Sequence, residues 1–99
     1  MDKYTVRELH GQLHGEVKTT VVTVSGGPTL LTPAPLKDRK DMSLHNSGSV
    51  TVYLGGVDVT INDGKPLAPG ADFQIEAGRV EMYAVASGID QLVRVFEVS

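Results

Sequence analysis

A chain of 99 residues is long enough for one domain, and its 40% hydrophobic and 21% charged residues are typical of a globular protein rather than a disordered one. The formal net charge is −3 and the basic residues are scattered, which argues against a nucleic-acid partner, because duplex-binding domains neutralise phosphates with clustered lysine and arginine. The absence of cysteine excludes disulfide bonds and thiolate chemistry, and no apolar run approaches the roughly 20 residues that a membrane span requires.

The first sixteen residues carry apolar side chains without a clear period. They could form one loose helical stripe, but two glycines within the segment weaken any helix. We expect residues 1–16 to be an extended N-terminal arm whose apolar side chains lie against a surface, either of their own domain or of a neighbouring molecule. The side chains assigned to partner contact are Tyr4, Val6, Leu9 and Leu13. The segment also lacks the apolar stretch of a secretory signal, so we expect a soluble protein that is made in the host cytoplasm.

Residues 18–25 (KTTVVTVS) predict a strand, because β-branched side chains fit a pleated surface better than a helix. The following stretch, 30–36 (LLTPAPL), is apolar and contains two prolines, which cannot donate a ladder hydrogen bond. We expect it to be an edge or a connector that follows the surface, and we assign Leu30 and Leu31 to partner contact. In this interpretation the first 38 residues reach towards partners more than they build the core.

From residue 39 onward the chain predicts a ladder of short strands separated by turn residues. Strands are expected at 41–46, 50–54, 57–61, 73–76, 80–86 and 92–98. The strongest local signal is Gly55-Gly56, which separates two alternating runs and predicts a tight hairpin between 50–54 and 57–61. Tyr53, on the first of these strands, is a further candidate for partner contact.

About six to eight short strands joined by turns predict an all-β fold, because an antiparallel sheet must bury one face. We expect a small antiparallel β-sandwich, jelly-roll-like or barrel-like, with residues 17–99 as a single domain behind the N-terminal arm.

The histidines are the only candidates for metal binding. His10 and His14 have the spacing of one helical face, but the glutamate of the metalloprotease motif is missing and no third ligand is evident nearby. His45 is expected on a strand surface. A small metal-dependent enzyme that uses His10, His14 and an unidentified carboxylate is one hypothesis, and it has the least support of those that we consider.

Other catalytic arrangements find even less support. The serines at 25, 47, 49 and 87 lie in turns, where their hydroxyl groups serve local backbone geometry, and none sits in a nucleophile elbow. Paired carboxylates are possible in principle, for instance Asp58 with Asp63, but Asp63 is more simply explained by the Asp-Gly turn that it begins. We predict a protein that is not an enzyme, with no catalytic residues and no cofactor or metal site.

Residues 39–98, about three fifths of the chain, contain five motifs in order: Asn46-Ser47-Gly48, Val52 to Gly56, Gly64 to Gly70, Tyr83 to Gly88 and Val93 to Glu97. Their order and spacing resemble a recurrent module of tailed-phage virion structural proteins. The resemblance implies a small β-sandwich on a phage particle, of the head-decoration or accessory-capsid type, and it carries no catalytic residues.

For function, the resemblance implies a head decoration (cement) protein on the capsid surface of the virion. Such a protein binds the major capsid protein in the assembled shell and stabilises it, and we expect it to self-associate as a trimer or other multimer on the lattice. The alternative is a carbohydrate- or receptor-binding module on a tail or fibre, with Tyr53 or Tyr83 stacked on a sugar. Neither nucleic acid nor membrane is expected as a partner.

Overall fold

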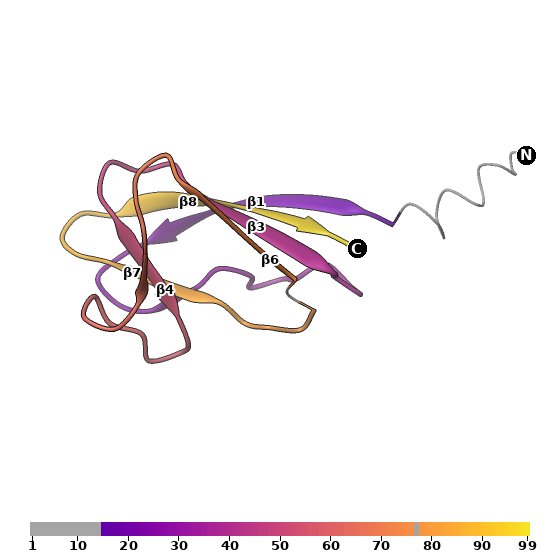
Figure 1. The fold of residues 1–99 in the computed structure, drawn as a ribbon, viewed down its shortest axis with the longest axis horizontal. Helices are drawn as coiled ribbons and strands as arrows, with labels where there is room; N and C mark the ends of the chain where they lie inside the picture. The colour runs from indigo at the N-terminus through magenta and orange to yellow at the C-terminus, as the bar shows by residue number, and fades with distance from the viewer. Residues whose placement is uncertain (1–14, 77) are drawn as a thin grey trace, which may run out of the picture.

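The computed structural model describes residues 15–76 and 78–99, and this part of the chain is built from strands and loops without a helix (Figure 1). The strands are β1 (Val17–Val24), β2 (Thr29–Leu30), β3 (Asp41–Asn46), β4 (Val52–Gly55), β5 (Lys65–Leu67), β6 (Asp72–Glu76), β7 (Tyr83–Ala86) and β8 (Gln91–Val98). They form two four-stranded sheets in which every pair is antiparallel. The prediction of an all-β antiparallel sandwich is confirmed.

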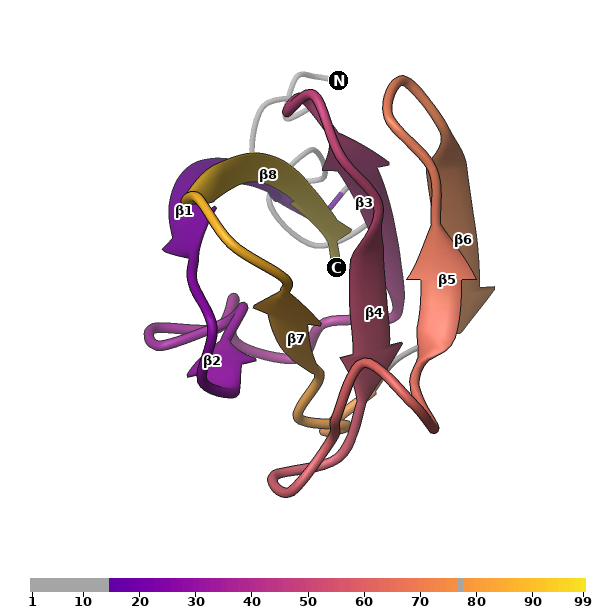
Figure 2. The same ribbon diagram turned by 90° about the vertical axis from the view of Figure 1, so that its left-hand side faces the viewer.

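The strand orders are β1-β8-β3-β6 in one sheet and β2-β7-β4-β5 in the other. The first strand thus pairs with the last, the second with the seventh, the third with the sixth and the fourth with the fifth. Four nested antiparallel pairs that wrap into two facing sheets make the topology of a jelly roll. In the end-on view, β1 and β8 lie on one side of the sandwich and β2 and β7 on the other (Figure 2).

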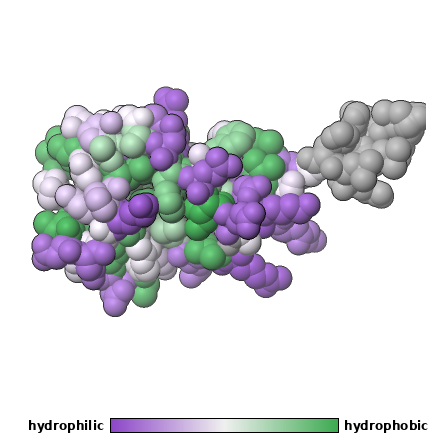
Figure 3. Space-filling model, viewed as in Figure 1, coloured by the Kyte–Doolittle hydropathy of each residue, from purple (hydrophilic) through white to green (hydrophobic). Residues whose placement is uncertain are grey.

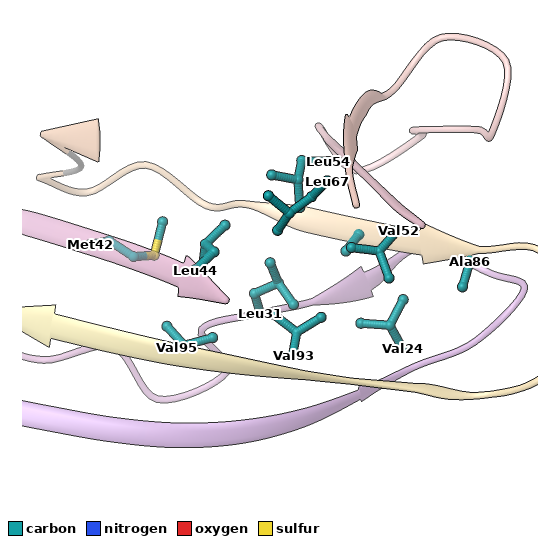
Figure 4. Packing of buried hydrophobic residues seen from close by; sticks show 11 residues of the cluster. Val24, Leu31, Met42, Leu44, Val52, Leu54, Leu67, Ala86, Val93 and Val95 are labelled. Carbon is teal, nitrogen blue, oxygen red and sulfur yellow. The ribbon is translucent and has the colours of Figure 1, made fainter. Parts of the chain in front are cut away.

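The core lies between the sheets and is almost entirely aliphatic (Figure 4). The alternation of β8 shows how the sequence builds it: Val93 and Val95 point inward and are buried, whereas Arg94 and Phe96 point outward. The buried cluster comprises Val24, Leu31, Met42, Leu44, Val52, Leu54, Leu67, Ala84, Ala86, Val93 and Val95.

The core includes part of the N-terminal region, so the expectation that the first 38 residues reach outward is wrong for the segment from β1 to Leu31. β1 pairs with β8 along its whole length, and Val24 and Leu31 have no exposed surface. The prolines at 33 and 35 follow this segment, and proline disrupts pairing only where its own N–H is needed. The Leu31 N–H, which precedes both prolines, donates a hydrogen bond to the Met82 carbonyl, at 2.9 Å.

The predicted hairpin at Gly55-Gly56 is also wrong. β4 pairs with β5, and residues 56–64 form a loop between them that contains no strand. The loop folds back over β4, so that Val59 is only 5% exposed. A Cβ atom at Gly55 would lie 2.6 Å from Val59 Cγ2, and glycine is therefore needed for this close approach rather than for a tight hairpin turn.

A local turn closes the same loop. Asp63 Oδ1 accepts hydrogen bonds from the backbone N–H and the hydroxyl group of Thr60, at 2.8 and 3.0 Å. These two donors favour the ionised carboxylate and lower the pKa of Asp63 below its ordinary value. The Asp-Gly turn predicted from the sequence is present, and Asp63 has a structural role in it.

Two buried amide side chains fix the corner where β3, β4 and β8 meet. Asn46 is fully buried, donates to the carbonyls of Val50 and Leu67 at 2.9 and 2.8 Å, and accepts from the Gly48 N–H at 2.9 Å. Gln91 accepts from the N–H groups of residues 49 and 50 and donates to the carbonyls of residues 89 and 90. The Asn46-Ser47-Gly48 motif is therefore a structural corner.

Replacing Asn46 by alanine is expected to lower the free energy of unfolding by about 2 kcal/mol, because it leaves buried backbone groups without a partner. Urea denaturation of the purified domain measures this loss. Ser47→Ala is the matched control: Ser47 is exposed and its backbone bond to Leu92 survives the change, so an effect below about 0.5 kcal/mol is expected. Equal effects of the two substitutions would contradict the assigned role of Asn46.

A buried ion pair lies at the other end of the β1-containing sheet. Arg39 Nη1 and Glu97 Oε2 are 2.9 Å apart, with 2% and 1% of their side chains exposed. The same guanidinium group donates to the carbonyls of Gly78 and Val80. The segment predicted as a strand from residue 80 is a strand only from Tyr83, and the Val80 carbonyl before it is bound by Arg39.

Candidate interaction surface

The outward face of the β1-β8-β3-β6 sheet is organised in rows set by the strand register. Odd-numbered residues of β1 lie opposite even-numbered residues of β8, so Thr19 faces Phe96 and Val21 faces Arg94. Arg94 in turn lies opposite His45 of β3. These side chains point away from the core, because their sequence neighbours fill it.

Four large apolar side chains stand exposed on this outward face. Val17 is 60% exposed, Val21 59%, Leu92 46% and Phe96 44%. We call these four residues the β1–β8 face. In the space-filling view, one group of hydrophobic side chains lies at the upper edge toward the right, where Figure 1 places β1 and β8, with strongly polar side chains beside it (Figure 3). Contiguous apolar side chains on a sheet surface are typical of a protein-binding site, whereas single ones need no explanation.

A polar border adjoins the apolar residues on the side of β3 and β6. His45 Nδ1 lies 2.7 Å from Asp72 Oδ1, and both side chains are substantially exposed. A groove runs between this pair and the apolar residues, and Arg94 and Phe96 contribute to its lining. An apolar centre beside a polar, hydrogen-bonding border is the composition of protein–protein interfaces.

The side chains assigned to partner contact from the sequence lie elsewhere. Leu30 and Tyr53 are half-buried on β2 and β4, in the opposite sheet, where Leu30 lies opposite Tyr83. Leu31 has no exposed surface and is a core residue. Of the three described candidates, Leu30 and Tyr53 thus share the outward face of this sheet, on the strands either side of β7, and Leu31 does not. The remaining candidates, Tyr4, Val6, Leu9 and Leu13, lie outside the described residues, as does most of the N-terminal arm.

Sequence reasoning missed the β1–β8 face, although the sequence contains a signal for it. In β8 the valines at 93 and 95 point inward, and Leu92 and Phe96 point outward on either side of Arg94, so both sides of the strand carry large apolar residues. One side of a strand in a two-layer sandwich normally faces water and is polar. Large apolar residues on both sides of such a strand therefore indicate that the outer face of its sheet is a binding surface.

The candidates for metal binding, His10 and His14, lie outside the described residues. Among residues 15–76 and 78–99 no three histidine, aspartate or glutamate side chains gather as a metal site. Asp63 is bound within its own turn by Thr60. Nor does the described part of the chain include a helix with the length and apolarity that crossing a bilayer demands.

Comparisons with protein-family models, with curated proteins and with solved structures find no match to this chain.

Proposed function

We propose that this chain is a phage head decoration protein that binds the outside of an assembled capsid through the β1–β8 face. The single observation that carries the proposal is that face: four exposed apolar side chains on one side of a small jelly roll. Jelly rolls are common in viral capsid proteins, and the motifs of residues 39–98 resemble phage virion modules. Because proteins with the same fold can have different functions, the experiment must test the β1–β8 face itself.

The proposed mechanism is selective binding. A protein that binds the assembled shell, and not its free subunits, shifts the assembly equilibrium towards the shell. A rigid sheet is suited to this task, because its side chains are held in place before binding and little conformational entropy is lost. Repeated sites on a lattice, together with self-association of the decoration protein, would strengthen each individual contact. The major capsid protein is thus the proposed partner, and no catalysis is required.

The experiment uses shells that lack this protein. Wild-type protein is expected to sediment with these shells and to raise the temperature at which they fall apart. Phe96→Lys should weaken binding by at least about tenfold, because a buried apolar side chain of this size contributes about 1.5–3 kcal/mol. Val57→Lys is the matched control, since Val57 is 67% exposed in the loop 56–64 over the opposite sheet. It should bind as wild type does.

Two outcomes would contradict the proposal. One is the absence of wild-type protein from the shell fraction under every condition. The other is equal binding by Phe96→Lys and wild-type protein while Tyr53→Ala abolishes binding. The second outcome would favour a carbohydrate- or receptor-binding module, for which one observation speaks: Tyr53 and Tyr83 lie half-buried on neighbouring strands of the opposite sheet. A glycan array would then identify the ligand.

A further inference from the structure

The four sheet edges of the sandwich differ sharply in length. β2 has two residues and β5 has three, one of them Pro66, so neither offers a usable row of backbone donors. The longer edges are β6, with five residues, and β1, with eight. Exposed edge strands are templates for pairing with another chain unless something protects them.

β6 is protected by charge. Its outward side chains include Asp72 and Glu76, both exposed, which stand at equal distances on either side of Gln74. If two copies of β6 paired antiparallel around Gln74, Asp72 of one copy would face Glu76 of the other, twice. Like charges directly opposite each other destabilise a strand pair. The β6 edge therefore opposes its own self-association.

β1 has no such protection. Within the described part of the chain its only strand neighbour is β8. The Ser99 N–H donates to the Glu16 carbonyl at 2.9 Å, so in this register the even-numbered residues of β1 bond to β8. The odd-numbered residues then direct their N–H and C=O groups away from β8, because the two directions alternate along an antiparallel strand. These residues are Val17, Thr19, Val21 and Thr23, all of them uncharged and exposed.

We propose that β1 pairs antiparallel with β1 of a second copy of this chain, around a two-fold axis at Val21. In that register Val21 faces Val21 of the second copy, and Thr19 faces Thr23. Threonine pairs and β-branched pairs are favourable across antiparallel strands. The contact uses the same surface on both molecules, so it closes as a dimer and joins two four-stranded sheets into one of eight strands.

The pairing has a consequence for the outward surface. The β1–β8 faces of the two copies would lie on the same side of the joined sheet, so that Val17, Val21, Leu92 and Phe96 of each copy would be grouped around the two-fold axis. One strand pair buries less than the roughly 1,200–2,000 Å² of a stable interface, so the dimer is expected to form in a concentration-dependent way. The pairing does not depend on the proposed function.

Sedimentation equilibrium of the full chain over a wide range of concentrations tests the proposal, with two matched double variants. Thr19→Lys with Thr23→Lys places lysine opposite lysine twice in the dimer, and should raise the dissociation constant at least about tenfold. Thr19→Lys with Thr23→Glu places lysine opposite glutamate at the same positions. It should dimerise within about threefold of wild type or more tightly. Thermal melting establishes that both variants are folded.

A second measurement depends on the absence of cysteine from the native sequence. Val21→Cys should form a disulfide-linked dimer on mild oxidation, whereas Val57→Cys should form far less of it. The proposal is overturned if wild-type protein stays monomeric at every concentration, if it grows beyond a dimer into longer chains, or if the two double variants weaken association equally. The proposal is supported if Thr19→Lys with Thr23→Glu dimerises tightly, if Thr19→Lys with Thr23→Lys dimerises weakly, and if only Val21→Cys forms the cross-linked dimer.

Discussion

Replacing Leu31 by alanine is expected to lower the free energy of unfolding by about 3 kcal/mol. Leu31 has no exposed surface and belongs to the aliphatic cluster between the two sheets (Figure 4). Removing a buried leucine side chain costs the transfer free energy of the lost atoms and the free energy of the remaining cavity, together about 2–5 kcal/mol. Chemical denaturation followed by circular dichroism measures the loss.

The neighbouring residue provides the control. Leu30 is half-buried on the outer side of β2, so Leu30→Ala should cost less than about 1 kcal/mol. A large difference between two adjacent leucines would show that the segment before the prolines is part of the core. Small and equal effects would mean that this segment only covers the surface, as its sequence first suggests.

Replacing Arg39 by methionine is expected to destabilise the domain by about 3–5 kcal/mol, because it leaves the buried carboxylate of Glu97 without its positive partner. The loss should be large even though the ion pair itself adds little net stability, since forming it requires both charges to be removed from water. Lys40→Met is the control: Lys40 is the exposed neighbour of Arg39, and the change should fall within about 0.5 kcal/mol.

The double variant separates the ion pair from the rest of the site. Arg39→Met with Glu97→Met removes both charges, and should be more stable than Arg39→Met alone by at least about 1 kcal/mol. The free energies of unfolding of the wild type, Arg39→Met, Glu97→Met and the double variant form a double-mutant cycle. Strictly additive losses would contradict a coupled pair, and the hydrogen bonds from Arg39 to Gly78 and Val80 would then account for its whole contribution.

The sequence allowed the fold class to be predicted because most strands carry the period of two that burial of one face imposes. Predictions from local sequence patterns were wrong where contacts between distant parts of the chain determine the structure. Residues 57–61 alternate like a strand, yet only Val59 is buried, because the loop folds back over Gly55 and Gly64. β5 contains Pro66 and was not predicted, although proline is tolerated on an edge strand such as this one.

The candidate site was less predictable than the fold. Which side of β1 faces water depends on its register with β8, and Leu92 and Phe96 join Val17 and Val21 only across that strand pair. The chain positions of these residues differ by more than seventy, so no local window of sequence contains the surface. Partner contact was predicted instead for the N-terminal arm and the connector 30–36, because their apolar residues lie close together in the sequence.

The most direct test of the proposed function is an electron cryo-microscopy reconstruction of phage particles to which this chain has been bound. We predict density for the jelly roll on the outside of the head, with Leu92 and Phe96 against the major capsid protein and the loop 56–64 facing solvent. Density for the domain on the tail or a fibre would contradict placement on the head. Density on the head with the β2-β7-β4-β5 sheet against the shell would contradict the assignment of the β1–β8 face.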